Sequence, residues 1–497
     1  MSKLNNKLIF YILGLLLVFN GFAMLMASLI SYLTQDGVFN EIFFSSLVVV
    51  VTGWFIMLFS KNNDRKIHKR DAYFIVILGW LIMVFSGMVP YISTGSITSF
   101  SNIFFETMSG YTTTGSTVIN DIESLPESII FWRSMTHWLG GMGIIVLAIA
   151  ILPLLGIGGM QLFSAEAPGI TGDKIHPRIS DTAKRLWLIY VGLTLLETAL
   201  LKLAGMSLFD AINNSMSNIA SGGFSSKNDS VGFWNDSPLI QYIIIFFMFL
   251  AGTNFVLIYF GILGKFKKII SDTEFKWYVS FIATFVLITT LILFFNVDLN
   301  STSVEHPQVY GKFESSFRHS LFQVVAIVTT TGFVTGDFIS WTPFLTMLFF
   351  GIMFLGGSSG STSGGVKVLR HLILIKNGFL EFKRSLHPNA IFPLRHNNHV
   401  VEKPIIIHVL AFFILYLILF IIGAGVLSLL GLDFESAIGG AASSLGNVGP
   451  ALGTLGPTST FAGLPEIGKF WCAFLMLVGR LELFTVLIFF SPDFWKS

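Results

Sequence analysis

The chain has 497 residues, of which 53% are hydrophobic and only 12% are charged, and its mean hydropathy is +0.75. Soluble domains carry roughly 25% charged residues, so this composition excludes an ordinary soluble protein and indicates one that crosses a membrane many times. The net charge of +2 says little, because the placement of charge matters more than its sum. The single cysteine, Cys472, excludes an intramolecular disulfide framework.

Hydrophobic stretches of about 20 residues, the length that crosses the core of a bilayer, recur along the whole chain. The candidate spans lie at 8–33, 42–59, 71–92, 132–155, 186–204, 238–263, 277–296, 341–376, 404–430 and 467–490. Four shorter and more polar segments lie between particular spans, at 98–111, 207–219, 314–328 and 433–444. These segments are too short to cross, so we expect them to enter the membrane and return.

The placement of lysine and arginine predicts how the spans are oriented, because cytoplasmic loops carry an excess of both residues. With the N-terminus inside, 23 of the 30 basic residues fall on the inner side and five on the outer side. The remaining two, Lys202 and Arg480, lie within spans. We therefore expect both termini in the cytoplasm and all four short segments on the outer side.

The four short segments share one pattern, since each opens near a phenylalanine and ends in a cluster of small residues. The phenylalanines are Phe100, Phe209, Phe317 and Phe434, and the glycines near the ends are Gly115, Gly222, Gly332 and Gly446. A span precedes and follows each segment, so the repeating unit is a span, a short re-entrant helix, a glycine turn and a second span. Because each unit has two spans, successive units share one orientation and form parallel repeats around an axis along the membrane normal.

The predicted fold is therefore an all-α membrane protein with four parallel span–pore-helix–span repeats around a pseudo-fourfold pore. An extra N-terminal transmembrane hairpin, at 1–70, stands outside the repeats. The boundaries of the four pore repeats are predicted at 71–160, 161–265, 266–385 and 386–497.

The glycine turns form the predicted ion site. Backbone outside a helix is tolerated at membrane depth only where protein buries it or where it lines a wet cavity. Four such turns around one axis would present carbonyl oxygens that can replace the hydration shell of a cation. The turns contain no carboxylate, which favours a monovalent over a divalent ion. The predicted filter residues are Thr113, Thr114, Gly115, Ala220, Ser221, Gly222, Thr330, Thr331, Gly332, Leu445, Gly446 and Asn447.

The other interpretation of these small residues is helix packing, to which threonine and glycine often contribute in membranes. For a single turn, the two interpretations have roughly even odds. Four turns at regular spacing on one side of the membrane favour the ion site.

A predicted gate lies below the filter. The span at 341–376 is too long for one straight crossing and is interrupted by "GGSSGSTSGG" at 356–365, which indicates a mobile loop within the membrane. A kink or a phosphate-binding loop is the alternative, but the phosphate-loop pattern fails because Val366 separates Gly365 from Lys367. The predicted gate residues are Gly356, Gly357, Ser358, Ser359, Gly360, Ser361, Gly364 and Gly365, together with Arg480.

Arg480 is assigned to the gate because an arginine inside a span is costly and by default marks a functional site. The alternative is a structural ion pair with Glu482 or Glu197, another membrane-embedded acid. Both interpretations stay open from the residues alone.

With these residues in view, the sequence resembles the Trk/Ktr/HKT superfamily of potassium transporters along nearly its whole length. The resemblance rests on the four filter segments and on "GGSSGSTSGGVKVLR" at 356–370. It also rests on "SAEAPG" and "DKIHPRISDTAKRLW" within 164–187 and on "LVGRLELFTVL" at 477–487. The extra N-terminal hairpin fits the Trk-type bacterial branch better than the shorter Ktr pattern.

The resemblance implies potassium uptake across the bacterial cytoplasmic (inner) membrane by a multi-pass protein that is not an enzyme. Gly115 is the family feature that accompanies K+ preference, whereas the sodium-selective plant branch carries serine there. The family also implies that the loop at 356–365 constricts the pore beside Arg480, and that the protein is a homodimer with one pore in each protomer. A cytosolic RCK-type regulatory subunit that binds NAD, ATP or ADP would be a separate chain. We expect K+ as the transported ion, contact with membrane lipid, no organic cofactor on this chain and no nucleic acid.

The ion and the mode of transport both have alternatives. A sodium-selective or non-selective relative would share the same architecture, and channel conduction is not distinguished from H+ or Na+ symport. The embedded acids Glu106, Glu197 and Glu482 could couple protons, but none has a distinctive placement. A membrane-embedded enzyme is disfavoured, because the sequence holds no recognisable metal-binding motif or paired acid and base.

Overall fold

The computed structural model describes residues 4–60, 69–155, 179–299, 302, 304, 306–397 and 399–496. This part of the chain is mostly helical, and its strands form only the short hairpin of β1 (Arg395–His396) and β2 (His399–Val400). The prediction of a helical membrane-type protein is confirmed for these residues. The motif at 164–178 and the predicted repeat boundary at 160 lie outside the described residues.

The N-terminal hairpin consists of α1 (Asn6–Thr34) and α2 (Phe39–Phe59). The two helices approach closely at Gly14 and Gly53, where a Cβ atom added to Gly14 would lie 2.8 Å from the Gly53 carbonyl oxygen. Small residues let helix backbones come this close in membrane proteins. Asp36, in the turn between the helices, accepts a hydrogen bond from the backbone N–H of Ser128 at 2.9 Å, which ties the hairpin to the rest of the chain.

The elements after the hairpin follow one order, in which a long helix, a short helix and a further helix succeed one another. The first run is α3 (Lys69–Gly87) with α4 (Val89–Thr94), α5 (Phe100–Tyr111) and α6 (Glu127–Leu155). The second is α8 (Ile179–Leu203), α9 (Leu208–Ile219), η2 (Ser230–Trp234), α10 (Pro238–Ala251) and α11 (Phe255–Ile262). The third follows α12 (Phe266–Ser271) and comprises α13 (Thr273–Asn296), α14 (Lys312–Val328), α15 (Pro343–Ile352) and α16 (Val368–Leu386). The fourth comprises α17 (Lys403–Leu429), α18 (Phe434–Gly446), η3 (Gly453–Leu455), η4 (Phe461–Gly463), α19 (Glu466–Arg480) and α20 (Leu483–Leu487), before η5 (Ile488–Phe490) and α21 (Pro492–Lys496).

Six helical stretches in the described residues are long and apolar enough to cross a membrane, namely α1, α2, α3 with α4, α8, α13 and α17. Two further candidates are helix pairs bent at a short break, α10 and α11 by 110° and α19 and α20 by 115°. The sequence predicted one span in each of these places, at 238–263 and 467–490. In the structure each of these stretches is a broken helix rather than a straight one.

The breaks have local causes. At the first, the side chain of Asn254 accepts a hydrogen bond from the backbone N–H of Val256 at 2.8 Å and caps the start of α11. At the second, Glu482 has a φ of +58°, a left-handed conformation that does not continue a helix. A third break separates α15 from α16, at the place where the sequence predicted an interruption.

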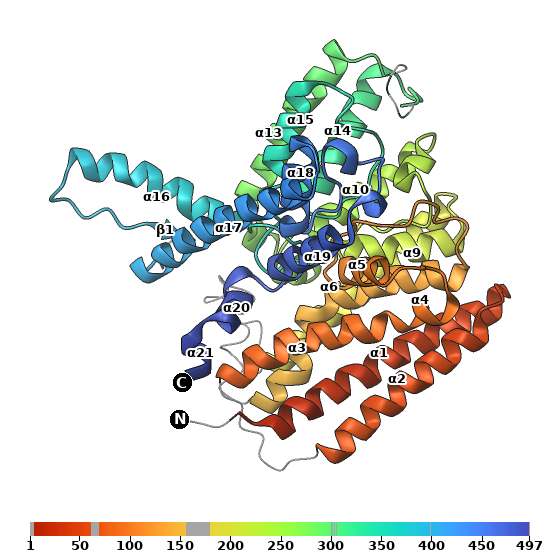
Figure 1. Cartoon of the computed structure of the whole chain (residues 1–497). Helices are drawn as coiled ribbons and strands as arrows, with labels where there is room; N and C mark the ends of the chain where they lie inside the picture. The colour runs from red at the N-terminus through yellow and green to blue at the C-terminus, as the bar shows by residue number, and fades with distance from the viewer. Residues whose placement is uncertain are drawn as a thin grey trace.

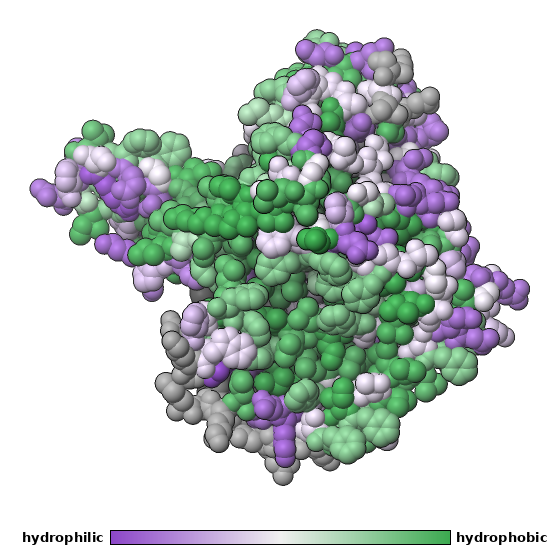
Figure 2. Space-filling model, in the orientation of Figure 1, coloured by the Kyte–Doolittle hydropathy of each residue, from purple (hydrophilic) through white to green (hydrophobic). Residues whose placement is uncertain are grey.

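Apolar side chains cover much of the outside of the protein. Figure 1 shows α1 and α2 along one flank, with α5, α18 and α19 nearer the middle and α16 projecting away with the β1–β2 hairpin. In the same view, Figure 2 shows hydrophobic residues over the broad front face and hydrophilic residues near the turn between α1 and α2 and on the outer part of α16. Phe22 in α1 and Phe44 in α2 are more than half exposed, as expected for helices that face lipid.

Candidate functional site

Four turns in the chain share one unusual backbone conformation. Each has a residue other than glycine in the left-handed region one or two positions after a helix ends, namely Thr113, Ser221, Thr330 and Asn447, with φ between +51° and +55°. Two positions later each has a glycine with positive φ, namely Gly115, Gly223, Gly332 and Gly449. Left-handed residues other than glycine are uncommon and often mark functional sites. The four turns are therefore equivalent in backbone geometry.

The turns are also hydrogen-bonded to the preceding helices in the same way. The residue after each left-handed position donates its backbone N–H to the carbonyl five residues earlier, at distances between 2.8 and 3.0 Å. The four bonds run from Thr114 to Ser109, Gly222 to Ser217, Thr331 to Ala326 and Val448 to Ser443. The C-termini of α5, α9, α14 and α18 thus lead directly into the turns, and their negative dipole ends favour a cation there.

The four turns close a ring. Each glycine lies so near the next turn that a Cβ atom built on it would fall 2.1–2.7 Å from a carbonyl oxygen there. The pairs are Gly115 with Gly222, Gly223 with Thr331, Gly332 with Val448 and Gly449 with Thr114. Each turn thus meets its successor, and the fourth meets the first, so the first and third turns lie opposite each other. Only glycine permits both the conformation and the approach.

In two of the four turns, the residues with the shared backbone conformation lie further along the chain than the predicted ones. The first and third turns have the register that the sequence indicated. In the second and fourth, the predicted residues Ala220, Leu445 and Gly446 lie one or two positions before the left-handed residue. The residues that complete those turns by conformation are Gly223, Val448 and Gly449, which the sequence analysis missed.

The loop between α15 and α16 lies against the ring. The backbone N–H of Gly364 donates to the hydroxyl of Thr330, in the third turn, at 2.6 Å. The Thr362 hydroxyl lies 3.0 Å from that of Ser221, in the second turn, and donates to the carbonyl of Ile219 at 2.9 Å. The predicted gate segment is therefore next to the turns. Thr362, which lies within the predicted loop but was not singled out there, bonds both the second turn and the end of α9.

The rest of the loop is held by backbone hydrogen bonds. The N–H of Ser358 donates to the carbonyl of Gly252, at the break between α10 and α11, at 2.8 Å. The N–H of Ser359 donates to the carboxylate of Glu274, in α13, at 2.6 Å. The ends of the loop meet where Gly356 N–H donates to the Val366 carbonyl at 2.9 Å. The loop therefore has a defined conformation that is fixed by its own run of helices and by the second run.

Arg480 joins the loop to the first run of helices. Its Nη1 donates to the Thr362 carbonyl at 2.8 Å, and its Nη2 donates to the Gly140 carbonyl, in α6, at 3.0 Å. The two acids that were alternative partners have other contacts. Glu482 pairs with Arg370 at 2.5 Å, and Glu197 accepts a hydrogen bond from Asn218 at 2.5 Å. The arginine lies beside the predicted gate, as the family resemblance implies.

Backbone oxygens rather than acidic side chains dominate the ring. The described residues contain no group of three or more His, Cys, Asp or Glu side chains placed to hold a metal ion. A ring of carbonyl and hydroxyl oxygens suits a weakly bound monovalent cation, whereas divalent cations are usually held by carboxylates.

The fold and the ring define a helical membrane protein of the cation-transport class, and comparison with known proteins identifies the family. Residues 38–497 match the model of the TrkH family, described as cation transport proteins, and the chain belongs to this family. It is 38% identical over 492 residues to the Trk system potassium uptake protein TrkH of Salmonella typhimurium, covering 98% of both chains. The protein of the same name from Halomonas elongata is 37% identical over 494 residues, covering 99% of both. The crystal structure of the potassium transporter TrkH from Vibrio parahaemolyticus matches with a TM-score of 0.86 and 35% identity, covering 98% of this chain and 99% of that one.

Proposed function

We propose that this chain takes up potassium ions across the bacterial inner membrane and that the ion passes through the ring of four turns. The closed ring is the observation that carries the proposal, because it gathers carbonyl oxygens from four turns at the C-termini of four helices. Such oxygens replace the water shell of a monovalent cation, and the helix dipoles add to the attraction. The names of the relatives as potassium uptake proteins support the same ion.

In this proposal, the four runs of helices are parallel repeats around the axis of the ring, and the α1–α2 hairpin stands outside them. The cyclic order of the turn contacts supports this arrangement, because each run touches the next and the last touches the first. The excess of lysine and arginine on one side supports a cytoplasmic location for both termini. The family resemblance supports a homodimer and a separate cytosolic RCK-type subunit that binds NAD, ATP or ADP.

The loop at 356–365 and Arg480 form the gate in this proposal. The loop contacts the second and third turns through Thr362 and Gly364, so an ion that leaves the ring would meet it. The guanidinium of Arg480 lies beside the same loop and adds a positive charge to the constriction. A positive charge raises the barrier for a cation, and movement of the loop and the arginine away from the axis would lower it.

Uptake of labelled rubidium into liposomes tests the proposed function. The purified chain is reconstituted in liposomes loaded with potassium, and external K+, Rb+, Na+ and Li+ compete with the label. We expect K+ and Rb+ to compete strongly and Na+ and Li+ weakly. Equal competition by Na+ and K+ would contradict the selectivity, and no protein-dependent uptake by a folded preparation would contradict the transport role.

A further inference from the structure

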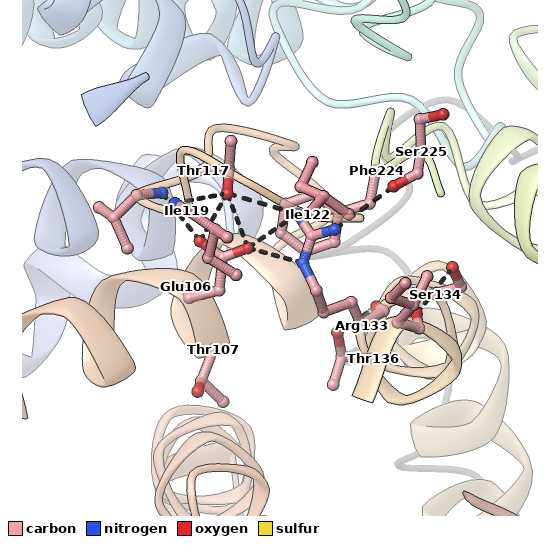
Figure 3. A network of polar contacts seen from close by, with 12 residues as sticks. Glu106, Thr107, Thr117, Ile119, Ile122, Arg133, Ser134, Thr136, Phe224 and Ser225 are labelled. Atoms are coloured by element: carbon pink, nitrogen blue, oxygen red, sulfur yellow. Dashed lines mark hydrogen bonds and ion pairs between the residues drawn. The ribbon is translucent and has the colours of Figure 1, made fainter. Parts of the chain in front are cut away.

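A buried ion pair lies among residues that closely follow the first and second turns, namely Thr117, Phe224 and Ser225 (Figure 3). Glu106, in α5, and Arg133, in α6, are at most 1% exposed. The Nε of Arg133 donates to the Glu106 carboxylate at 2.9 Å. A buried ion pair offsets its desolvation only when its geometry is good and its remaining polar atoms are also hydrogen-bonded. The other hydrogen-bond partners of this pair therefore show which parts of the chain it holds in place.

The carboxylate of Glu106 holds the chain that leaves the first turn. It accepts hydrogen bonds from the backbone N–H of Val118 at 2.9 Å and from the hydroxyl of Thr117 at 3.0 Å (Figure 3). The Nη2 of Arg133 donates to the same Thr117 hydroxyl at 3.3 Å. Thr117 and Val118 closely follow Gly115, so the pair fixes the path of the chain just beyond the ring.

The guanidinium of Arg133 also holds the chain that leaves the second turn. Its Nη1 donates to the Ser225 carbonyl at 3.4 Å. Its central carbon lies 4.2 Å from the centre of the Phe224 ring, in cation–π contact. The same ring stacks with the imidazole of His137, with the ring centres 4.0 Å apart. Phe224 and Ser225 directly follow Gly223, so one ion pair reaches the exits of two neighbouring turns.

The junction between the fourth and first turns has no such charged pair among its described contacts. There the Ser116 hydroxyl donates to the Gly449 carbonyl at 2.8 Å, and the Asn447 side chain donates to the Thr114 hydroxyl at 3.0 Å. Both are hydrogen bonds between neutral groups, which are weaker and less directional than a guanidinium–carboxylate pair. Of these two junctions, only the one between the first and second turns is held by a charged pair.

We propose that the Glu106–Arg133 pair is a clamp that sets the spacing of the first and second turns and so helps to determine which cation the ring accepts. The inference rests on the proposed function, since it assigns a selectivity role behind the ring. Gly115 meets the Gly222 carbonyl at this junction, so loosening the clamp would move that oxygen relative to the first turn. A carbonyl site discriminates between cations through the number and positions of its oxygens. Both residues are positioning residues.

Two substitutions separate the clamp from a general effect of charge. Glu106→Gln keeps the shape of the side chain and removes its charge. Arg133→Lys keeps the charge, but a lysine lacks the planar fork that reaches Thr117 and Ser225 together. The matched control is Glu123→Gln, which removes the same charge from the partly exposed ion pair with Lys227, whose atoms are 3.2 Å apart.

The full-length variants are compared in liposomes by potassium and sodium uptake, with thermal unfolding measured in parallel. We expect the ratio of K+ to Na+ uptake to fall about tenfold in Glu106→Gln and in Arg133→Lys, the factor that corresponds to one lost charge-assisted hydrogen bond. Glu123→Gln should keep the wild-type ratio. A folded Arg133→Lys variant with the wild-type ratio would overturn the clamp, even if Glu106→Gln failed to fold. If the wild-type protein itself did not take up K+ in preference to Na+, the proposed function would be contradicted instead.

Discussion

Replacement of Gly115 by serine perturbs the ring at one of its closest contacts. Gly115 has a φ of +85°, and a Cβ atom there would lie 2.1 Å from the Gly222 carbonyl oxygen. Real Cβ atoms essentially never come within 3.0 Å of another atom, so the two atoms must separate by a further 0.9 Å. Because the oxygen belongs to the second turn, the substitution displaces a carbonyl of the ring itself.

The matched control for this substitution is Gly37→Ser. Gly37 has a φ of +86°, and a Cβ atom there would have no neighbour within 4 Å. Both serines carry the strain of a left-handed residue, about 1–2 kcal/mol, but only the one at Gly115 forces backbone apart. A change of about 1.4 kcal/mol in discrimination corresponds to tenfold. We therefore expect the ratio of K+ to Na+ uptake to fall at least about tenfold in Gly115→Ser and to stay unchanged in Gly37→Ser.

The assay is competition of K+ and Na+ for rubidium uptake in liposomes, at equal amounts of folded protein. Thermal unfolding checks that both variants stay folded at the assay temperature; Gly115→Ser should lose more stability, because it also forces backbone apart. An unchanged uptake ratio in Gly115→Ser would refute the reasoning, because the carbonyl at the junction would then have no part in selectivity. An equal loss of selectivity in both variants would assign the effect to strain rather than to the contact.

Three further predictions concern the gate and the hairpin. Arg480→Ala removes the positive charge beside the loop, so rubidium uptake should rise; a fall in a folded variant would count against a barrier role. Thr362→Val removes the hydroxyl that bonds the second turn, so uptake should also rise, and unchanged uptake would show that closure does not depend on this contact. Burial alone would raise the pKa of Asp36, but hydrogen bonds, led by that from the Ser128 hydroxyl, outweigh it and hold the pKa below its usual value. Ionised Asp36 then stabilises the fold above its unfolded-state pKa of about 3.9, and this stabilisation is lost as the pH falls through the lower folded-state pKa. Below about pH 4 the melting temperature should therefore fall more steeply in the wild type than in Asp36→Asn.

The register of the turns shows what the sequence could and could not predict. In the first and third turns, a run of threonines ends in a single glycine, and the turns lie on the residues predicted from it. The second and fourth turns, "IASGG" and "SLGNVG", each contain two glycines. Either glycine of such a pair can take a positive φ, so residue types alone do not identify Gly223 and Gly449 as the ones at the ring.

Of the breaks in the helices, too, some could be predicted from the sequence and some could not. The break between α15 and α16 was predictable, because glycine and serine replace apolar residues at 356–365. The breaks at the ends of α10 and α19 are not visible in hydropathy, because hydropathy is averaged over about 19 residues and gives one apolar stretch across each break. The pair of Glu106 and Arg133 was also hidden, since the two residues are 27 positions apart and meet only through the packing of α5 against α6.

Anomalous diffraction from crystals grown with rubidium is the most direct test of the claim that the ring holds the transported ion. Rubidium substitutes for potassium and scatters strongly enough to be located. We predict a peak inside the ring, close to the carbonyl oxygens of Thr114, Gly222, Thr331 and Val448. Rubidium bound only elsewhere in a protein that still transports it would contradict the account.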